Sequence, residues 1–238
     1  MASDGKDGIM GFKIAIDGPA GAGKTTVARK VAEKLGFAYV DTGAMYRAMA
    51  LYLDRKGIDV SDADMVRTEC GNMDVSVTYD DGKQSVYVNG ENVDALIRTE
   101  KIGNLASIIG TNPDVRGKMT KLQRDIAENM DVVMEGRDIG TCILPDTEVK
   151  IYLTADVSVR AERRRKELME KGMPCDIGEL EKAIRERDER DMNREVAPLV
   201  RAEDAILINS SNRTVDDIVD GIVKFALNFG AGMTGKGK

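Results

Sequence analysis

Short apolar runs alternate along the chain with longer segments whose apolar residues recur every three or four positions. The runs predicted to be buried strands are Lys13–Asp17, Phe37–Val40, Val132–Glu135, Val149–Leu153 and Ala205–Ile208. Short, continuously apolar strands separated by helical segments are typical of a parallel sheet with crossover helices. We therefore expect an α/β fold of three layers, with a five-stranded parallel sheet between helices.

The apolar stripes also place the principal helices. One helix carries Val27, Val31 and Leu35 and stops at Gly36, and a second covers about residues 44–56 before Gly57. Further stripes are Val115, Met119, Leu122 and Ile126 in a third helix, and Ile218, Ile222 and Leu227 in the last. The last helix is expected to begin at Thr214, which forms a capping box with Asp217.

Residues 60–105 break this rhythm. Apolar and polar residues alternate over 75–79 and again over 86–88, with turn signals at Asp80-Asp81-Gly82 and at Asn89-Gly90. This pattern predicts a small, half-exposed antiparallel sheet inserted into the parallel-sheet domain. Insertions of this kind often cover a second substrate. The expected organisation is a core of 12–59 and 106–229, the insertion at 60–105, and flexible tails at 1–11 and 230–238.

A glycine-rich segment directly follows the first strand. Gly18-Pro19-Ala20-Gly21-Ala22-Gly23-Lys24-Thr25, followed by Thr26, matches the phosphate-loop pattern G-x-x-x-x-G-K-[ST] between a strand and a helix. Backbone N–H groups of such a loop and the helix N-terminus bind a polyphosphate. Lys24 would reach the β- and γ-phosphates, and Thr25 would ligate Mg²⁺. An ordinary glycine-rich turn is the alternative, but the flanking strand and helix favour a nucleoside triphosphate site.

The amino-acid composition excludes several kinds of catalysis and metal binding. The 238 residues suit one α/β domain with an insertion, carry a net charge of −6 and include no histidine. Imidazole acid–base catalysis and His-ligated metals are therefore excluded. Cys70, Cys142 and Cys175 are far apart and indicate neither a disulfide framework nor a zinc site. The chain lacks a signal-peptide pattern and any apolar run near the ~20 residues of a membrane span. We expect a cytoplasmic monomer that binds neither nucleic acid nor membranes.

Charged turns follow two of the predicted strands, at the sheet edge where open α/β sheets bind ligands. Asp41-Thr42-Gly43 follows the second strand, with Arg47 one helical turn later, and Glu135-Gly136-Arg137-Asp138 ends the third. Glu135 stands where a second oxygen ligand would hold Mg²⁺ or its waters. Ordinary strand-end turns are the alternative, but two charged turns on the edge that carries the phosphate loop favour a site.

Two arginine-rich segments complete the pattern. Helices are predicted over 156–171 and 180–195, joined by Gly172-Met173-Pro174, and residues 156–176 are expected to act as a lid. Arg187, Asp191 and Arg194 recur at helical spacing and share one face. Charge-rich helices are usually solvated surfaces with weak ion pairs. Next to a phosphate loop, however, arginines suit phosphoryl transfer, because they grip phosphate bidentately and stay charged. A lid would also exclude water.

These blocks together resemble bacterial cytidylate kinases over residues 12–229. The matching segments are 14–26, 40–47, 135–141, 186–194 and Ala197-Pro198-Leu199. The resemblance implies that Arg47, Arg137, Arg187 and Arg194 contact the acceptor phosphate and sugar, that Asp191 contacts the ribose, and that Ser107, Arg116 and Asp138 read cytosine. It also places Thr42 at a small hydroxyl position of the acceptor site, and Arg163 and Arg164 as the lid arginines nearest the triphosphate.

The predicted activity is ATP- and Mg²⁺-dependent phosphorylation of CMP and dCMP, with Lys24, Arg137, Arg187 and Arg194 as catalytic residues. A kinase of the same fold with another acceptor, such as UMP, thymidylate or a small polar metabolite, is the nearest alternative. A nucleotide-dependent switch is another, since Asp54-Arg55-Lys56-Gly57 matches D-x-x-G. That match lies at a helix end, and the sequence has no Asn-Lys dipeptide for reading guanine.

Overall fold

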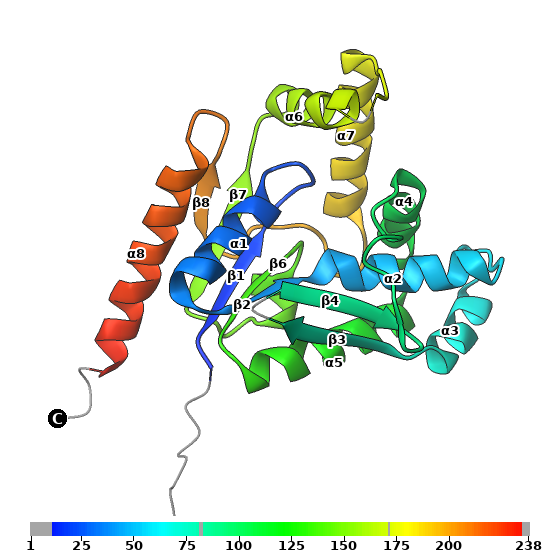
Figure 1. The fold of residues 1–238 in the computed structure, drawn as a ribbon, viewed down its shortest axis with the longest axis horizontal. Helices are drawn as coiled ribbons and strands as arrows, with labels where there is room; N and C mark the ends of the chain where they lie inside the picture. Colours follow the sequence, from blue (N-terminus) through cyan, green and yellow to red (C-terminus); the bar gives the residue numbers. More distant parts are fainter. Residues whose placement is uncertain (1–10, 81–82, 171, 235–238) are drawn as a thin grey trace, which may run out of the picture.

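A five-stranded parallel sheet runs through the centre of the molecule (Figure 1). The structure is a computed structural model that describes residues 11–80, 83–170 and 172–234. The strands are β1 (Lys13–Asp17), β2 (Ala38–Asp41), β6 (Val132–Gly136), β7 (Val149–Thr154) and β8 (Ile206–Asn209), in the order β2-β6-β1-β7-β8. The bounds of the predicted strands are all within one residue of these. The α/β prediction is therefore confirmed.

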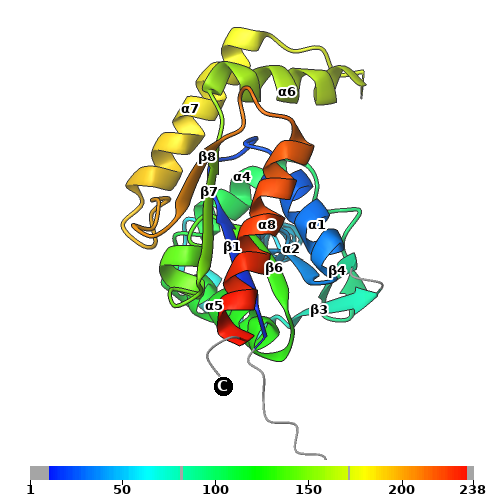
Figure 2. The same ribbon diagram turned by 90° about the vertical axis from the view of Figure 1, so that its left-hand side faces the viewer.

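Helices cover both faces of the sheet. On one face α1 (Lys24–Leu35) and α8 (Val215–Thr234) pack side by side, with Val27 and Ile218 in one apolar cluster (Figure 2). On the other face α2 (Thr42–Arg55) and α5 (Pro113–Asn129) bury Met45 and Met119 in a second cluster. These long, unbranched methionine side chains fill volume that the scarce aromatic residues leave free.

The end of the chain departs from the prediction. The Thr214 hydroxyl oxygen accepts a hydrogen bond from the Asp217 N–H at 3.1 Å, which confirms the predicted cap. However, α8 runs to Thr234, so residues 230–234 are helical rather than part of a flexible tail. A glycine costs only about 1 kcal/mol in a helix, which an established helix can tolerate. The remaining tail residues, 1–10 and 235–238, lie outside the described part of the chain.

The predicted insertion contains an antiparallel sheet of β3 (Val75–Asp80), β4 (Lys83–Val88) and β5 (Glu91–Asn92). Asn89 and Gly90 both have positive φ, 49° and 83°, as a type I′ hairpin turn requires. Of the other predicted turn, residues 81–82 lie outside the described residues. The antiparallel sheet predicted for this segment is thus confirmed.

Two helices were not predicted, one within the insertion and one that begins in it and ends beyond residue 105. They are α3 (Ala63–Asn72), capped by the Asp62 side chain, and α4 (Glu100–Ile109), capped by Thr99. Helix α4 packs against α2, and buried residues of the insertion join the apolar cluster of α2 and α5. The insertion is therefore anchored to the core through shared apolar packing.

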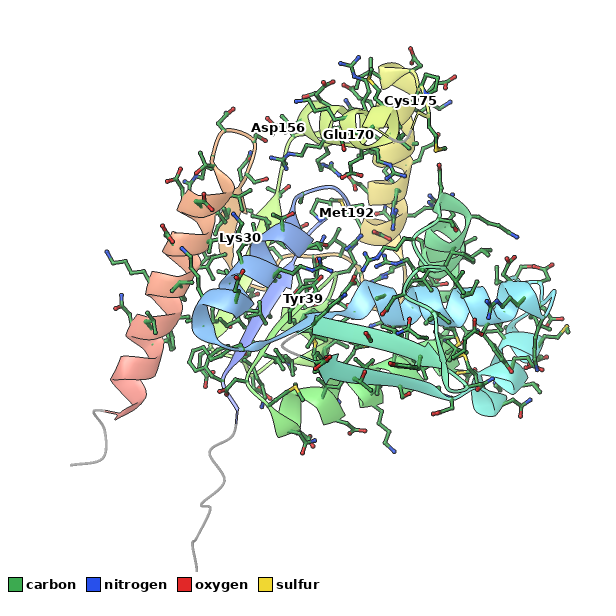
Figure 3. All side chains as sticks on the ribbon, in the orientation of Figure 1. Lys30, Tyr39, Asp156, Glu170, Cys175 and Met192 are labelled. Atoms are coloured by element: carbon green, nitrogen blue, oxygen red, sulfur yellow. The ribbon has the colours of Figure 1, made fainter. Side chains whose placement is uncertain are left out.

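The two arginine-rich helices stand over the carboxyl ends of the strands, and the second of them lies beside α4 (Figure 1). They are α6 (Val157–Glu170) and α7 (Ile177–Asn193), and Gly172 between them has a φ of +71°. Figure 3 labels Asp156 before α6, Glu170 at its end and Cys175 just before α7. A short π-helix, η1 (Ile139–Ile143), follows β6. The fold thus brings the phosphate loop, the charged turns at the strand ends and the two arginine-rich helices to one end of the molecule.

Candidate active site

The loop between β1 and α1 has the backbone shape that only glycine favours. Gly18 and Gly23 have φ of +146° and +93°, in the region where a Cβ is strained. A Cβ on Gly18 would also lie 1.9 Å from the carbonyl oxygen of Leu153 on β7. These positions therefore need glycine for the loop to curl against the sheet end, as a phosphate loop does.

Lys24, the first residue of α1, is buried inside this loop. Its ammonium group donates hydrogen bonds to the carbonyl oxygens of Gly18 at 2.7 Å and Pro19 at 2.8 Å. Burial and, after it, the nearby charge of Arg137 lower the pKa of Lys24 to about 7, although Glu135 opposes the shift. A polyphosphate beside the ammonium would favour its charged form, because nearby anions raise the pKa of a base.

The two predicted metal ligands lie together. Glu135 on β6 is buried and accepts a hydrogen bond from the Tyr39 hydroxyl at 2.5 Å, and the Thr25 side chain lies close enough to this carboxylate to act against the rise of its pKa. Burial raises the pKa of Glu135, and the neighbouring carboxylate of Asp41 adds to the rise. Within the described residues, no three Asp, Glu, Cys or His side chains form a metal cage. A hydroxyl and one carboxylate suit Mg²⁺ that is held mainly by nucleotide phosphates.

Asp17, at the end of β1, was not among the predicted site residues. Its two carboxylate oxygens accept the N–H groups of Ile139 and Gly140, each at 2.8 Å. Burial raises its pKa to about 6, although these two hydrogen bonds oppose the shift. Asp17 thereby fixes the start of η1, directly after Arg137 and Asp138. Its place immediately before the phosphate loop was the only sequence signal for this role.

The structure gathers the four arginines predicted to contact the acceptor: Arg47 from α2, Arg137 after β6, Arg187 in α7 and Arg194 at its end. Arg47 pairs with Asp41 and Arg137 with Asp191, each at 3.0 Å. Burial lowers the pKa of Arg187 to about 10, and the nearby charges of Arg137 and Arg47 act in the same direction. The site therefore holds several guanidinium groups close enough to repel one another, as a site for a multiply charged anion would.

Three of these arginines are incompletely bonded. Arg47 Nε, Arg187 Nε and Arg194 Nη2 are buried and have no hydrogen-bond partner in the part of the chain that the structure describes. A buried, unpaired donor costs about 1–3 kcal/mol. A bound anion with several oxygens would satisfy these donors and offset the charge repulsion.

The predicted base-reading residues are brought together in part. Arg116 and Asp138 form a buried ion pair, and Arg194 Nη2 lies 3.5 Å from the other Asp138 oxygen. Ser107 on α4 instead donates to Asp191 on α7 at 3.3 Å, and so joins the predicted ribose contact. The Thr42 hydroxyl is occupied, since it donates to the Glu135 carbonyl oxygen at 2.7 Å.

A cavity of about 830 Å³ opens between α4 and α7. Its size is suitable for a nucleotide, because ligand pockets usually measure ~300–1,000 Å³. It includes three of the residues predicted for the acceptor. The lining residues are Ser107, Ile108, Thr111, Glu186, Glu189, Arg190, Asp191, Asn193 and Arg194.

On the donor side, the structure separates the two predicted lid arginines. Arg163 reaches the phosphate loop, where it donates to the Ala22 carbonyl oxygen at 3.4 Å and to the Ser210 carbonyl oxygen at 2.9 Å. Arg164 pairs with Glu167 on its own helix and is partly exposed. Arg160 was not a predicted site residue, but it also reaches the loop, at the carbonyl oxygen of Ala20.

Arg98 is a second arginine near the site that was not predicted from the sequence. It comes from the insertion, and its guanidinium lies 3.1 Å from the same Asp41 oxygen that pairs with Arg47. Nothing in the local pattern around Arg98 links it to residue 41. Its role is visible only once the insertion is packed against the core.

A phosphate loop, adjacent hydroxyl and carboxylate ligands, and a cluster of arginines at the end of a parallel sheet define a phosphoryl-transfer enzyme of the P-loop class. The chain belongs to the cytidylate kinase family, whose model, described as "Cytidylate kinase", matches residues 14–228. The family resemblance stated from the sequence is thereby confirmed, as is the prediction of a phosphotransferase that acts on a phosphate group.

Relatives with the same description align with almost the whole chain. A cytidylate kinase from Fervidobacterium nodosum is 47% identical over 214 residues, covering 90% of this chain and 95% of the relative. One from Shouchella clausii is 43% identical over 213 residues, with coverage of 90% and 95%. Among solved structures, a gluconokinase from Sinorhizobium meliloti has a TM-score of 0.48 at 14% identity, covering 96% of this chain and 99% of that one. None of the helices in the described ranges is long and apolar enough to cross a membrane.

Proposed function

We propose that this chain transfers the γ-phosphoryl group of ATP to CMP and dCMP, and that it does so by in-line displacement. An oxygen of the acceptor phosphate attacks the γ-phosphorus while the bond to the β–γ bridging oxygen breaks, and ADP leaves. The observation that carries the proposal is the set of buried donors without a hydrogen bond on Arg47, Arg187 and Arg194, of which Arg194 Nη2 has the Asp138 carboxylate within ion-pair distance. Such donors fit the charge-rich oxygens of an acceptor phosphate rather than the hydroxyl of an alcohol.

The residues of the chain have separable roles in this reaction. The phosphate loop and Lys24 hold the donor, while the arginine cluster aligns the acceptor phosphate and stabilises the charge on the transferred group. No general base is needed, because the acceptor phosphate is already an anion. Arg116 and Asp138 would read the ring atoms and amino group of cytosine, and Ser107 and Asp191 would lie at the sugar.

The oxygen ligands near the loop fit Mg²⁺. We propose that Thr25 and Glu135 hold the ion or its bound waters. When bound with ATP, Mg²⁺ would neutralise charge on the β- and γ-phosphates. We further propose that the enzyme works as a cytoplasmic monomer, which agrees with free thiols at Cys70, Cys142 and Cys175.

An acceptor screen tests the proposed function. ADP formation from ATP and Mg²⁺ is measured with CMP, dCMP, UMP, AMP, dTMP or no acceptor. CMP and dCMP are expected to stimulate ADP formation about 10- to 200-fold more than UMP does, because the wrong base leaves buried polar groups unpaired at ~1–3 kcal/mol. Stimulation by a different acceptor would refute the base assignment. Slow hydrolysis that no acceptor stimulates would instead favour the nucleotide-dependent switch.

Replacing Asp138 with alanine should weaken the acceptor site selectively. The substitution leaves Arg116 without its buried ion-pair partner and removes the group proposed to face the cytosine amine. We expect kcat/KM for CMP to fall about 10- to 200-fold, with ATP affinity measured by calorimetry unchanged. Asp146→Ala, at an exposed position of the following loop, is the matched control. Near-normal CMP turnover in Asp138→Ala would contradict the assignment of the acceptor site.

A further inference from the structure

Arg160 in α6 connects the donor loop to the acceptor helix. The residue is only 3% exposed. Its Nη1 donates to the Ala20 carbonyl oxygen in the phosphate loop at 3.1 Å, and its Nε donates to the Ala155 carbonyl oxygen at 2.9 Å. The guanidinium also grips both carboxylate oxygens of Asp188 on α7, at 3.0 and 2.5 Å. One buried side chain of α6 therefore bonds the phosphate loop and α7 at once.

The bond to Ala20 sets the orientation of a phosphate-loop peptide. The Ala20 carbonyl and the Gly21 N–H belong to one planar trans peptide, so they point in opposite directions. A Cβ on Gly21 would lie 3.3 Å from the Arg160 Cβ, which places the arginine stem directly along the outside of the loop. With its carbonyl held toward α6, this peptide directs the Gly21 N–H away from α6. Phosphate loops bind nucleotide phosphates with such N–H groups.

The bond to Asp188 reaches the acceptor side. Asp188 directly follows Arg187 and lies three residues before Asp191, so it belongs to the turn of α7 that carries both. Asp188 is itself buried, and a bidentate Arg–carboxylate pair fixes orientation as well as distance. Arg160 thus constrains the rotation of the helix that presents the acceptor arginines.

We propose that Arg160 is a positioning residue that couples the two substrate sites: occupancy of the phosphate loop by the donor strengthens binding of the acceptor through Asp188. The inference rests on the proposed function for the identity of the two ligands. Because Arg160 uses its donors within the protein, it acts through the Ala20–Gly21 peptide and through α7 rather than by touching substrate. Coupling of this kind is reciprocal, so each ligand tightens binding of the other by the same factor.

Calorimetry of CMP binding tests the coupling. CMP is titrated into the enzyme with and without Mg²⁺ and a saturating β,γ-imido analogue of ATP, which cannot transfer its phosphoryl group. The wild type is expected to bind CMP about tenfold more tightly with the analogue, within the usual range of allosteric coupling. Arg160→Lys should reduce this ratio to within about twofold of unity, because a single ammonium cannot bridge Ala20 and both Asp188 oxygens.

The controls separate coupling from folding. Arg165→Lys alters a partly exposed ion pair with Glu162 on the same helix and should keep the wild-type ratio. If the single variant unfolds, the double variant Arg160→Met/Asp188→Leu replaces the ion pair by apolar side chains of similar size, a change that buried pairs often tolerate. The double variant should also bind CMP equally well with and without the analogue.

Two results would show that Arg160 is purely structural. In the first, Arg160→Lys has a lower melting temperature but the same ratio of CMP affinities with and without the analogue as the wild type. In the second, the wild type itself binds CMP equally well with and without the analogue. Failure of the proposed function is recognised separately, because in that case the wild type would not bind CMP at all.

Discussion

Replacing Lys24 with alanine is expected to abolish phosphoryl transfer to every acceptor, with a loss in kcat of about 10³-fold or more. Lys24 is the one buried ammonium in the described part of the loop, bonded to the Gly18 and Pro19 carbonyl oxygens. Binding of a triphosphate would draw it from these neutral acceptors to charged oxygens, an interaction that strengthens as charge develops in the transition state. Steady-state ADP formation with CMP and with the other nucleotides measures the effect.

Lys30→Ala is the matched control for this experiment. Lys30 lies in the same helix and pairs with Asp216, and both side chains are largely exposed. Exposed pairs contribute only about 0–1 kcal/mol, so activity should stay within twofold of the wild type. Substantial activity in Lys24→Ala would show that the loop does not hold the reacting phosphate, and would undermine the whole assignment of the donor site.

Most of the sheet could be predicted from the sequence because β1, β2, β6 and β7 are mostly buried, whereas the edge strand β8 is largely exposed. Continuous apolar runs such as 149–153 admit few other interpretations, and Gly36 marks a helix end by its left-handed φ of 70°. Helices α3 and α4 gave weaker signals. The first buries only Val66 and Cys70, and the second begins among residues that also suit a loop. Their stability comes from packing against the core, which local sequence does not encode.

The site was predictable where residue type and strand position coincide. Arg137 and Glu135 end a strand at the ligand edge, and no long-range contact was needed to place them. The roles of Arg160 and Arg98 depend on partners 28 and 57 residues away, Asp188 and Asp41. A single sequence cannot show which of many arginines find a buried carboxylate and which stay unpaired. That distinction requires the folded geometry.

Replacing Arg187 with methionine is expected to change activity and stability in opposite directions. Its pKa is lowered to about 10 from 12.5, by burial and by Arg137 and Arg47. The folded state therefore holds this charge less favourably than the unfolded chain does, which lowers the free energy of unfolding. This penalty is fully present below pH 10 and disappears only above the pKa of the unfolded chain. Methionine keeps most of the volume without the charge. The melting temperature without nucleotide should rise by about 2–4 °C for each kcal/mol relieved.

In the same variant, kcat/KM for CMP should fall about 10²- to 10³-fold, because a positioned cation at the transferring phosphate is lost. Arg185→Met, an exposed position two residues earlier on α7, should change neither quantity. The opposite signs distinguish two roles. Replacing an arginine that serves packing would lower the stability of the protein, whereas replacing one that serves to bind an anion would raise it. A lower melting temperature together with wild-type kinetics would mean that Arg187 holds α7 in place and that the acceptor phosphate binds elsewhere.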